Sequence, residues 1–158
     1  MTPIKTTRAR LLTRTNGPAV SAGILLAVLL GAPALAAPKG VSIEKPWIRL
    51  IIKARPAAGY FTLHNNGDKP VTLTGASSSA CGMAMLHQSK EVNGVEKMLP
   101  VKSVTVKPHG TLKFQPGSYH VMCMKPKMAL GQSVPMTLKF ADGDSITAQF
   151  PVKGPGGK

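Results

Sequence analysis

The 158-residue chain is strongly basic, with 20 Lys and Arg against six Asp and Glu and a formal net charge of +14. With so few carboxylates, no defensible Ser/His/Asp spacing and no Gly-rich phosphate loop, the sequence argues against an enzyme. No arginine cluster interleaved with aromatic residues is present, so we expect the charge to serve solubility and loose attraction to an anionic membrane or an acidic partner, rather than nucleic-acid binding.

The first 36 residues are typical of an export signal peptide. A basic stretch from Lys5 to Arg14 precedes an apolar run from Pro18 to Leu30, and Ala34-Leu35-Ala36 has the small residues of a cleavage site. The apolar run is shorter than the roughly 20 residues needed to span a bilayer. We therefore expect cleavage near Ala36 and export to the periplasm.

Beyond residue 36, short segments of alternating or β-branched residues recur between turn residues, and none keeps a helical period for three turns. This cadence predicts an all-β chain, an antiparallel sandwich or small barrel in one domain over residues 37–152. Asn93-Gly94 is the clearest hairpin turn, and the tail 153–158 is expected to be disordered. The predicted strands cover residues 41–43, 47–51, 58–64, 71–77, 84–89, 97–100, 104–106, 111–114, 120–124, 133–140 and 145–151.

The chain has two cysteines, Cys81 and Cys123. In an exported bacterial protein they are compatible with one disulfide, because the compartment outside the cytoplasm is oxidising. Cys123 also lies between two methionines, which leaves open the alternative that one or both thiols join a metal site.

The residues most suited to chemistry are two imidazoles and two thioethers: His87, Met98, His120 and Met122. Thioethers have little attraction for Mg, Ca or Mn and compete poorly for Zn, whereas Cu(I) accepts both sulfur and imidazole. Methionine also binds metal without losing a proton. The set therefore predicts a site for cuprous copper.

Side-chain alternation along strands brings further methionines to the same sides as these residues. A hairpin would return Met98 beside His87, so that four donors converge at one edge of the sandwich. Met85 and Met124 are candidate auxiliary ligands, with simple packing as the alternative. His64 and His109 lie at turns outside the set, and Trp47 and Tyr60 are expected in the core. The residues that share a side are Met83, Met85 and His87 on one strand, and His120, Met122 and Met124 on another.

These motifs resemble those of the periplasmic PCuAC-type copper(I) chaperones, which carry a His or Met, ten residues, Met, twenty-one residues and His-x-Met. The four residues named above match this pattern in type and spacing. The resemblance extends over nearly the entire predicted mature region. It rests further on the stretches Trp47–Arg49, Gly59–Tyr60, Asn93–Val101 and Pro116–Met122.

The resemblance implies a cupredoxin-like β-barrel or sandwich, Cu(I) held near the surface by His87, Met98, His120 and Met122, and copper transfer towards respiratory oxidase assembly. The implied acceptor is a Sco-type protein or an oxidase subunit. The alternatives are a periplasmic copper buffering or tolerance protein, an electron-transfer cupredoxin with Cys123 as thiolate ligand, and a metal-free interaction module. Strand alternation points Cys123 away from His120 and Met122, which weighs against the electron-transfer alternative.

Overall fold

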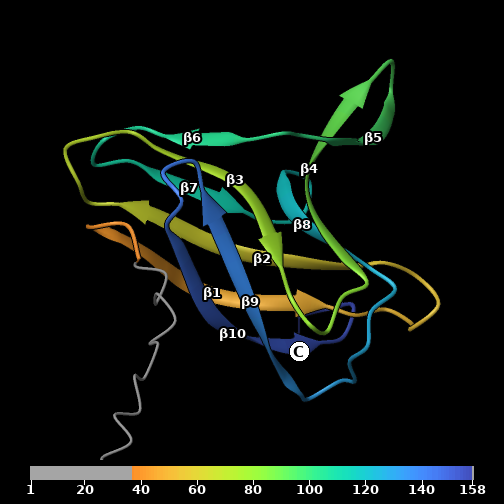
Figure 1. Ribbon diagram of the computed structural model, residues 1–158. Helices are drawn as coiled ribbons and strands as arrows, with labels where there is room; N and C mark the ends of the chain where they lie inside the picture. Colours follow the sequence, from red (N-terminus) through yellow and green to blue (C-terminus); the bar gives the residue numbers. More distant parts are fainter. Residues whose placement is uncertain (1–36, 158) are drawn as a thin grey trace, which may run out of the picture. The chain divides into compact units, whose positions relative to one another are not determined.

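The computed structural model describes residues 37–157, so the predicted signal peptide lies outside the described residues. Over this range the chain forms ten strands and no helix, and accordingly contains no helix that is long and apolar enough to cross a membrane. The strands, labelled in Figure 1, are β1 (Val41–Arg49), β2 (Ala57–Asn65), β3 (Val71–Ser77), β4 (Met83–Val92), β5 (Val95–Pro100), β6 (Val104–Val106), β7 (Thr111–Phe114), β8 (Tyr119–Met124), β9 (Ser133–Phe140) and β10 (Ser145–Lys153).

The strands follow one another laterally in the order β5-β4-β8-β7-β2-β1-β10-β9-β3-β6. Most neighbours are antiparallel, while β1 with β10 and β7 with β8 are parallel. β3 packs against β4, so the two ends of this long sheet come together around one core (Figure 1). The predicted all-β sandwich or barrel is confirmed, although its pairing is mixed rather than purely antiparallel.

The first strand differs from the sequence prediction. Residues 41–43 and 47–51 were expected as two strands, but the structure has one strand with an irregularity between Glu44 and Trp47. Lys45 has a positive φ of 50° and is followed by Pro46, which has no amide hydrogen to donate. The chain therefore bulges here and resumes pairing with β2 instead of turning.

The β4–β5 hairpin is confirmed, with a turn at Asn93-Gly94. Asn93 and Gly94 have φ values of 54° and 76°, the left-handed pair that a tight two-residue hairpin turn requires. The paired region is longer than predicted, because Val92 and Val95 close it directly beside the turn. β5 is the last strand of the sheet on this side, and all of its residues are exposed.

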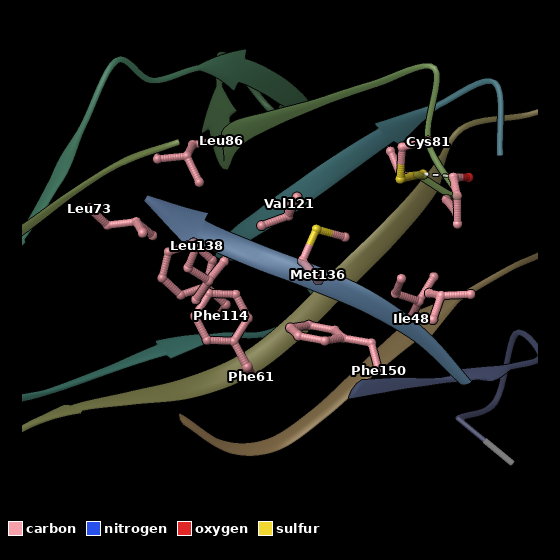
Figure 2. Close-up of a cluster of buried hydrophobic side chains, with 14 of the residues drawn as sticks. Ile48, Phe61, Leu73, Cys81, Leu86, Phe114, Val121, Met136, Leu138 and Phe150 are labelled. Atoms are coloured by element: carbon pink, nitrogen blue, oxygen red, sulfur yellow. Dashed lines mark hydrogen bonds between the residues drawn. A yellow bond between two sulfur atoms is a disulfide. The ribbon is translucent and has the colours of Figure 1, made fainter. Parts of the chain in front are cut away.

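The core is built from inward-facing residues of every strand except β5, some of which Figure 2 shows. Phe61 and Phe114 stack with ring centroids 4.3 Å apart, and Phe150 meets Phe61 edge-on at 5.9 Å. β4 and β8 contribute Leu86 and Val121, both buried. Because strand residues alternate between faces, the neighbours of Leu86 and Val121 in sequence lie on the outer face of the sheet.

Cys81 and Cys123 form a disulfide with their Cα atoms 5.3 Å apart, one of the two alternatives that the sequence left open (Figure 2). Cys123 is fully buried on the core face of β8, and Cys81 lies in the loop before β4. The bond ties that loop to β8 from the core side. Neither sulfur is a thiolate in this state, so the alternative of cysteine metal ligands does not fit the structure.

Candidate metal centre

The pairing of β4 with β8 places the histidines and methionines of the two strands directly opposite one another. The cross-strand pairs are His87 with His120, Met85 with Met122, and Met83 with Met124. The intervening pairs, Ala84 with Cys123 and Leu86 with Val121, face the other side. Alternation predicted which residues share a side within each strand, and the register adds that the two sets lie side by side on the outer face.

His87 and His120 form a buried pair at the centre of this face. Their ring centroids are 5.8 Å apart with an interplanar angle of 25°, and the residues are only 8% and 3% exposed. Nδ1 of His120 donates to the carbonyl oxygen of Ser118 at 3.2 Å, which leaves Nε2 as the atom with a lone pair. A backbone carbonyl holding one ring nitrogen is the usual way in which a metal-binding histidine is oriented.

Two nitrogen atoms of this pair have no hydrogen-bond partner: Nδ1 of His87 and Nε2 of His120. A buried polar atom without a partner costs about 1–3 kcal/mol, so such atoms are uncommon in folded proteins and call for an explanation. A metal ion bound to both lone pairs would satisfy them. The arrangement therefore fits a metal with a preference for neutral nitrogen ligands.

Met98 and Met122 lie on opposite sides of the histidine pair. Met98 is opposite Ser89 on β4, and Pro100 is opposite His87, so Met98 is diagonal to His87 rather than directly beside it as expected. Diagonal neighbours on one sheet face remain within reach of a long side chain. Met122 stands on β8 two residues beyond His120. All four donors of the predicted set are thus on one face.

The four residues differ in their access to solvent. Both histidines are buried, Met122 is half-buried, and Met98 is 54% exposed. The site was expected near the surface as a whole, but only its thioethers reach solvent. Because the thioethers reach solvent and the imidazoles are buried, a metal ion or a partner protein would approach this site from the methionine side.

Tyr60 lies beside His120, and Trp47 and Arg49 in turn contact Tyr60. Tyr60 is 2% exposed but lies on the outer face, 6.4 Å from the His120 ring and 4.9 Å from the Trp47 ring. The Arg49 guanidinium stands 5.3 Å over the Tyr60 ring. Tyr60 is buried as expected, although it faces the outer side of β2, because Ala57 at the start of the strand faces inward and side chains alternate. Trp47 is only half-buried, so the expectation that it belongs to the core is wrong.

The environment of His120 lowers its pKa. Burial lowers the pKa of His120 below its usual 6.5, an effect that the Ser118 carbonyl opposes and that the nearby His87 and Arg49 reinforce. Burial also raises the pKa of the Tyr60 hydroxyl. His120 is therefore neutral at pH 7, the form that a metal ligand requires.

Of the two candidate auxiliary ligands, Met85 pairs with Met122 and so adjoins the four residues, while Met124 lies one pair further along. Met83, opposite Met124, is 57% exposed. By contrast, Met128 is 3% exposed and belongs to the core.

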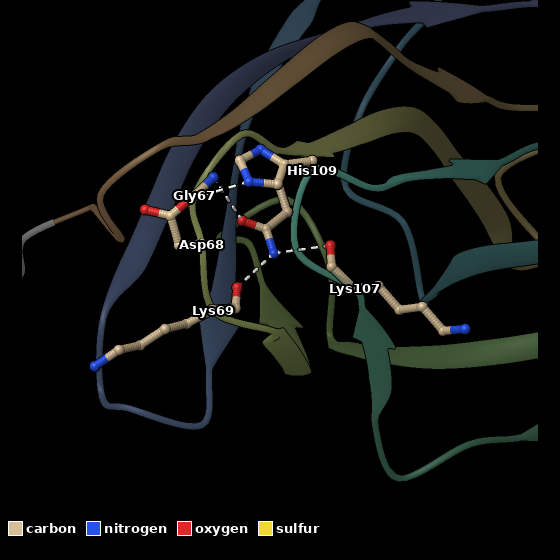
Figure 3. Close-up of polar contacts among 6 residues, drawn as sticks. Gly67, Asp68, Lys69, Lys107 and His109 are labelled. Carbon is tan, nitrogen blue, oxygen red and sulfur yellow. Dashed lines mark hydrogen bonds and ion pairs between the residues drawn. The ribbon is translucent and has the colours of Figure 1, made fainter.

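The other two histidines have partners. His64 contacts Thr111 at 3.1 Å and Glu44 at 3.0 Å, and His109 contacts Asp68 at 3.0 Å (Figure 3). Over residues 37–157, no three or more His, Cys, Asp or Glu side chains come together as a group suited to a metal ion. The donor set on the outer face differs from such groups because half of it is thioether.

Comparisons with known proteins agree with this picture. The family model described as "Putative lipoprotein LpqE-like" matches residues 41–152. "Putative lipoprotein Lxx21020" from Leifsonia xyli subsp. xyli (strain CTCB07) is 35% identical over 117 residues, which cover 72% of this chain and 70% of that protein.

Among solved structures, Cu(I)-DR1885 from Deinococcus radiodurans is similar with a TM-score of 0.60 and 30% identity, over 74% of this chain and 80% of that one. The copper-bound PCuAC domain from PmoF2 has a TM-score of 0.61 and 21% identity, over 78% of this chain and all of that domain. The second likeness concerns the fold alone, and it confirms the expected PCuAC-type, cupredoxin-like architecture.

Proposed function

The chain belongs to the LpqE-like family, and on that premise we propose that it is a copper(I) chaperone that captures Cu(I) at His87, Met98, His120 and Met122 and hands it to an acceptor protein. The copper is cargo, and no bond-making catalysis is involved. The observation that carries the proposal is the buried histidine pair with two unpartnered ring nitrogens, flanked on the same face by a thioether on either side.

The donor set selects the metal and its oxidation state. Two neutral imidazoles and two neutral thioethers suit soft Cu(I) far better than hard cations such as Mg or Ca, and thioethers compete poorly for Zn. Thioethers bind without losing a proton, so the site avoids much of the proton competition that thiolate ligands face. Cu(I)-DR1885, which is 30% identical, supports the same metal here.

Hand-over follows from the open thioether side. Met98 is the most exposed donor, so its bond to copper is the first that an incoming acceptor ligand can replace. Thiolates bind Cu(I) more tightly than thioethers, so stepwise exchange runs towards a cysteine-containing acceptor. Nitrogen ligands are released last because they are buried.

We further propose that the protein is exported to the periplasm, as the signal-like sequence of residues 1–36 and the lipoprotein description of its relative indicate. The proposed acceptor is a Sco-type protein or an oxidase subunit, in the assembly of the copper centres of a respiratory oxidase. This destination rests on the resemblance of the ligand motif to PCuAC-type chaperones.

The test is an anaerobic Cu(I) competition titration with X-ray absorption at the copper edge, on wild type, His120→Ala and Met122→Ala. We expect a tight first equivalent with mixed nitrogen and sulfur scattering, weakened at least about 100-fold in His120→Ala, which corresponds to about 2.7 kcal/mol. His64→Ala and His109→Ala are matched controls, because these histidines lie outside the site. Equal Cu(I) affinity in wild type and all variants would refute the assignment of this site.

Two other functions separate from this one by simple measurements. Copper buffering gives the same titration, but deleting the gene would then leave oxidase activity intact under copper limitation, whereas a delivery role predicts its loss. An electron-transfer cupredoxin requires a cysteine thiolate and would show intense visible absorption with Cu(II). The Cys81–Cys123 disulfide favours the chaperone over this alternative.

A further inference from the structure

Four methionines form two adjacent cross-strand pairs on the outer face: Met85 with Met122, and Met83 with Met124. We call these four residues the methionine ladder. Only Met122 belongs to the site proposed above, so three of the four thioethers have no assigned role. The ladder continues the line of the histidine pair towards the start of β4 and the end of β8.

The geometry of paired strands brings the four sulfurs within reach of one ion. Directly opposite side chains have Cβ atoms about 4.5–5.5 Å apart, and successive residues on one face of a strand are about 7 Å apart. Methionine has three rotatable bonds beyond Cα, so its sulfur can adjust over this distance. The thioethers of two adjacent pairs can therefore surround a single soft cation between them.

The exposure of the ladder argues against core packing as its purpose. Met83 is 57% exposed and the other three are half-buried, whereas the core methionines Met128 and Met136 are 3% and 0% exposed. The inward residues of the same strands, such as Leu86 and Val121, already supply the core. Four flexible thioethers side by side on an open face are an arrangement suited to a soft metal.

We propose that the methionine ladder is a second Cu(I) site, an all-thioether position from which copper passes to the histidine pair; this rests on the chaperone function proposed above. Met122 belongs to both positions. In the transfer, copper remains Cu(I), sulfur–copper bonds to Met83, Met85 and Met124 are broken, and bonds to the two imidazole nitrogens and Met98 replace them. No oxidant, reductant or proton is needed.

The surroundings give the transfer a direction. Met124 also borders a groove of about 450 Å³ that is lined by four cationic side chains: Lys53, Arg55, Lys125 and Lys127. Their positive charge, although screened by water, raises the energy of a cation at this end of the ladder. The histidine pair is not part of the groove lining and offers two nitrogen ligands. The ladder is therefore the weaker position, and copper moves inward.

The experiment is a competition titration with Cu(I), without oxygen, on the full chain and on a triple variant, Met83→Leu/Met85→Leu/Met124→Leu. Leucine keeps the volume and removes the sulfur. We expect two equivalents in wild type, the second held by Met83, Met85 and Met124 with sulfur-only scattering while Met122 stays with the histidine pair, and one equivalent in the triple variant. Met128→Leu, in the core, is the matched control and should keep both equivalents.

A second measurement separates this inference from the proposed function. In a His87→Ala/His120→Ala variant, the ladder should still bind one Cu(I) with sulfur-only scattering. ¹³C-methyl spectra of methionine should show shifts at Met83, Met85 and Met124. One equivalent with mixed scattering in wild type would overturn the ladder and leave the chaperone site intact. Two equivalents in the triple variant would also overturn the ladder. No binding in any protein would overturn both proposals.

Discussion

Histidines in two regions of the molecule differ in whether their ring nitrogens have hydrogen-bond partners. At one end of the β-fold, which we call the Asn65 end, His109 pairs with Asp68, and Asn65 joins the neighbouring loops by hydrogen bonds (Figure 3). On the outer face of β4 and β8, His87 and His120 are buried with unpartnered nitrogens. The first region satisfies its polar groups internally, and the second leaves strong ligands without partners. Residue type is the same in both, so the surroundings decide which histidines can bind a metal.

The largest expected effect comes from the cross-link behind the outer face. Replacing both Cys81 and Cys123 by alanine should lower the free energy of unfolding by about 4 kcal/mol, because the disulfide closes a long loop with a sequence separation of 42 residues. Urea unfolding measures this loss. Hydrogen exchange should increase first in β8 and not at the Asn65 end. A loss below about 1 kcal/mol would mean that the fold holds this region without the bond.

Removing the side-chain amide of Asn65 should destabilise the Asn65 end without affecting the outer face. The Asn65 side chain donates to the carbonyl oxygens of Lys69, Val106 and Lys107 and accepts from the Gly67 amide. Asn65→Ala leaves these groups without a partner and should cost about 3 kcal/mol in unfolding free energy, with Cu(I) affinity unchanged. Asn66→Ala, at an exposed neighbour, is the control and should cost little. A fall in Cu(I) affinity would mean that the two regions are coupled.

Replacing a histidine of the outer face should raise, rather than lower, the free energy of unfolding of the copper-free protein. His87→Leu removes a buried nitrogen without a partner, so we expect the copper-free protein to gain about 1 kcal/mol of unfolding free energy. The same variant should lose the thermal stabilisation that Cu(I) gives the wild type. His109→Leu, at the Asn65 end, should keep that stabilisation in full. If His87→Leu were strongly destabilising without copper, the pair would be structural.

The smallest effect concerns acidification of the copper-free protein. Burial lowers the pKa of His120 below 6.5, so between that lowered value and 6.5 the unfolded chain binds more protons than the folded one. Unfolding free energy should therefore fall as pH drops below about 6.5. In His120→Gln this part of the dependence should be absent. Urea unfolding from pH 7.5 to 5 measures the difference, and parallel curves for the two proteins would contradict the assignment.

Much of the fold was accessible from local sequence. Residues 71–77, 104–106, 111–114 and 133–140 are strands with the predicted bounds, because alternation and turn residues act over a few positions. Lys45 and Pro46 misled the prediction of β1, since a bulge and a turn have the same sequence signals. Apart from the β4–β5 hairpin at Asn93-Gly94, the neighbours of each strand were not predictable in this way, because their pairing depends on distant segments.

The candidate site likewise has some features that local sequence predicts and others that depend on distant segments. Alternation predicted that His87, Met85 and Met83 share a side, but only the antiparallel register with β8 shows that they face His120, Met122 and Met124. The diagonal position of Met98 and the burial of both imidazoles also depend on long-range packing. Tyr60 was missed as a neighbour of His120, although its alternation with Phe61 in β2 was a signal that Tyr60 faces outward.

The disulfide also limits which sulfur atoms of the chain are available to a soft metal. Cys81 and Cys123 are the chain's only cysteines, and their sulfurs are joined within the core behind the methionines. If reduced and exposed, they would become thiolate ligands, which bind Cu(I) more tightly than thioethers. Oxidation removes these internal rivals, so a loaded ion remains exchangeable. Under the proposed function, oxidising conditions therefore keep bound copper exchangeable, whereas reducing conditions would add two sulfur ligands able to retain it.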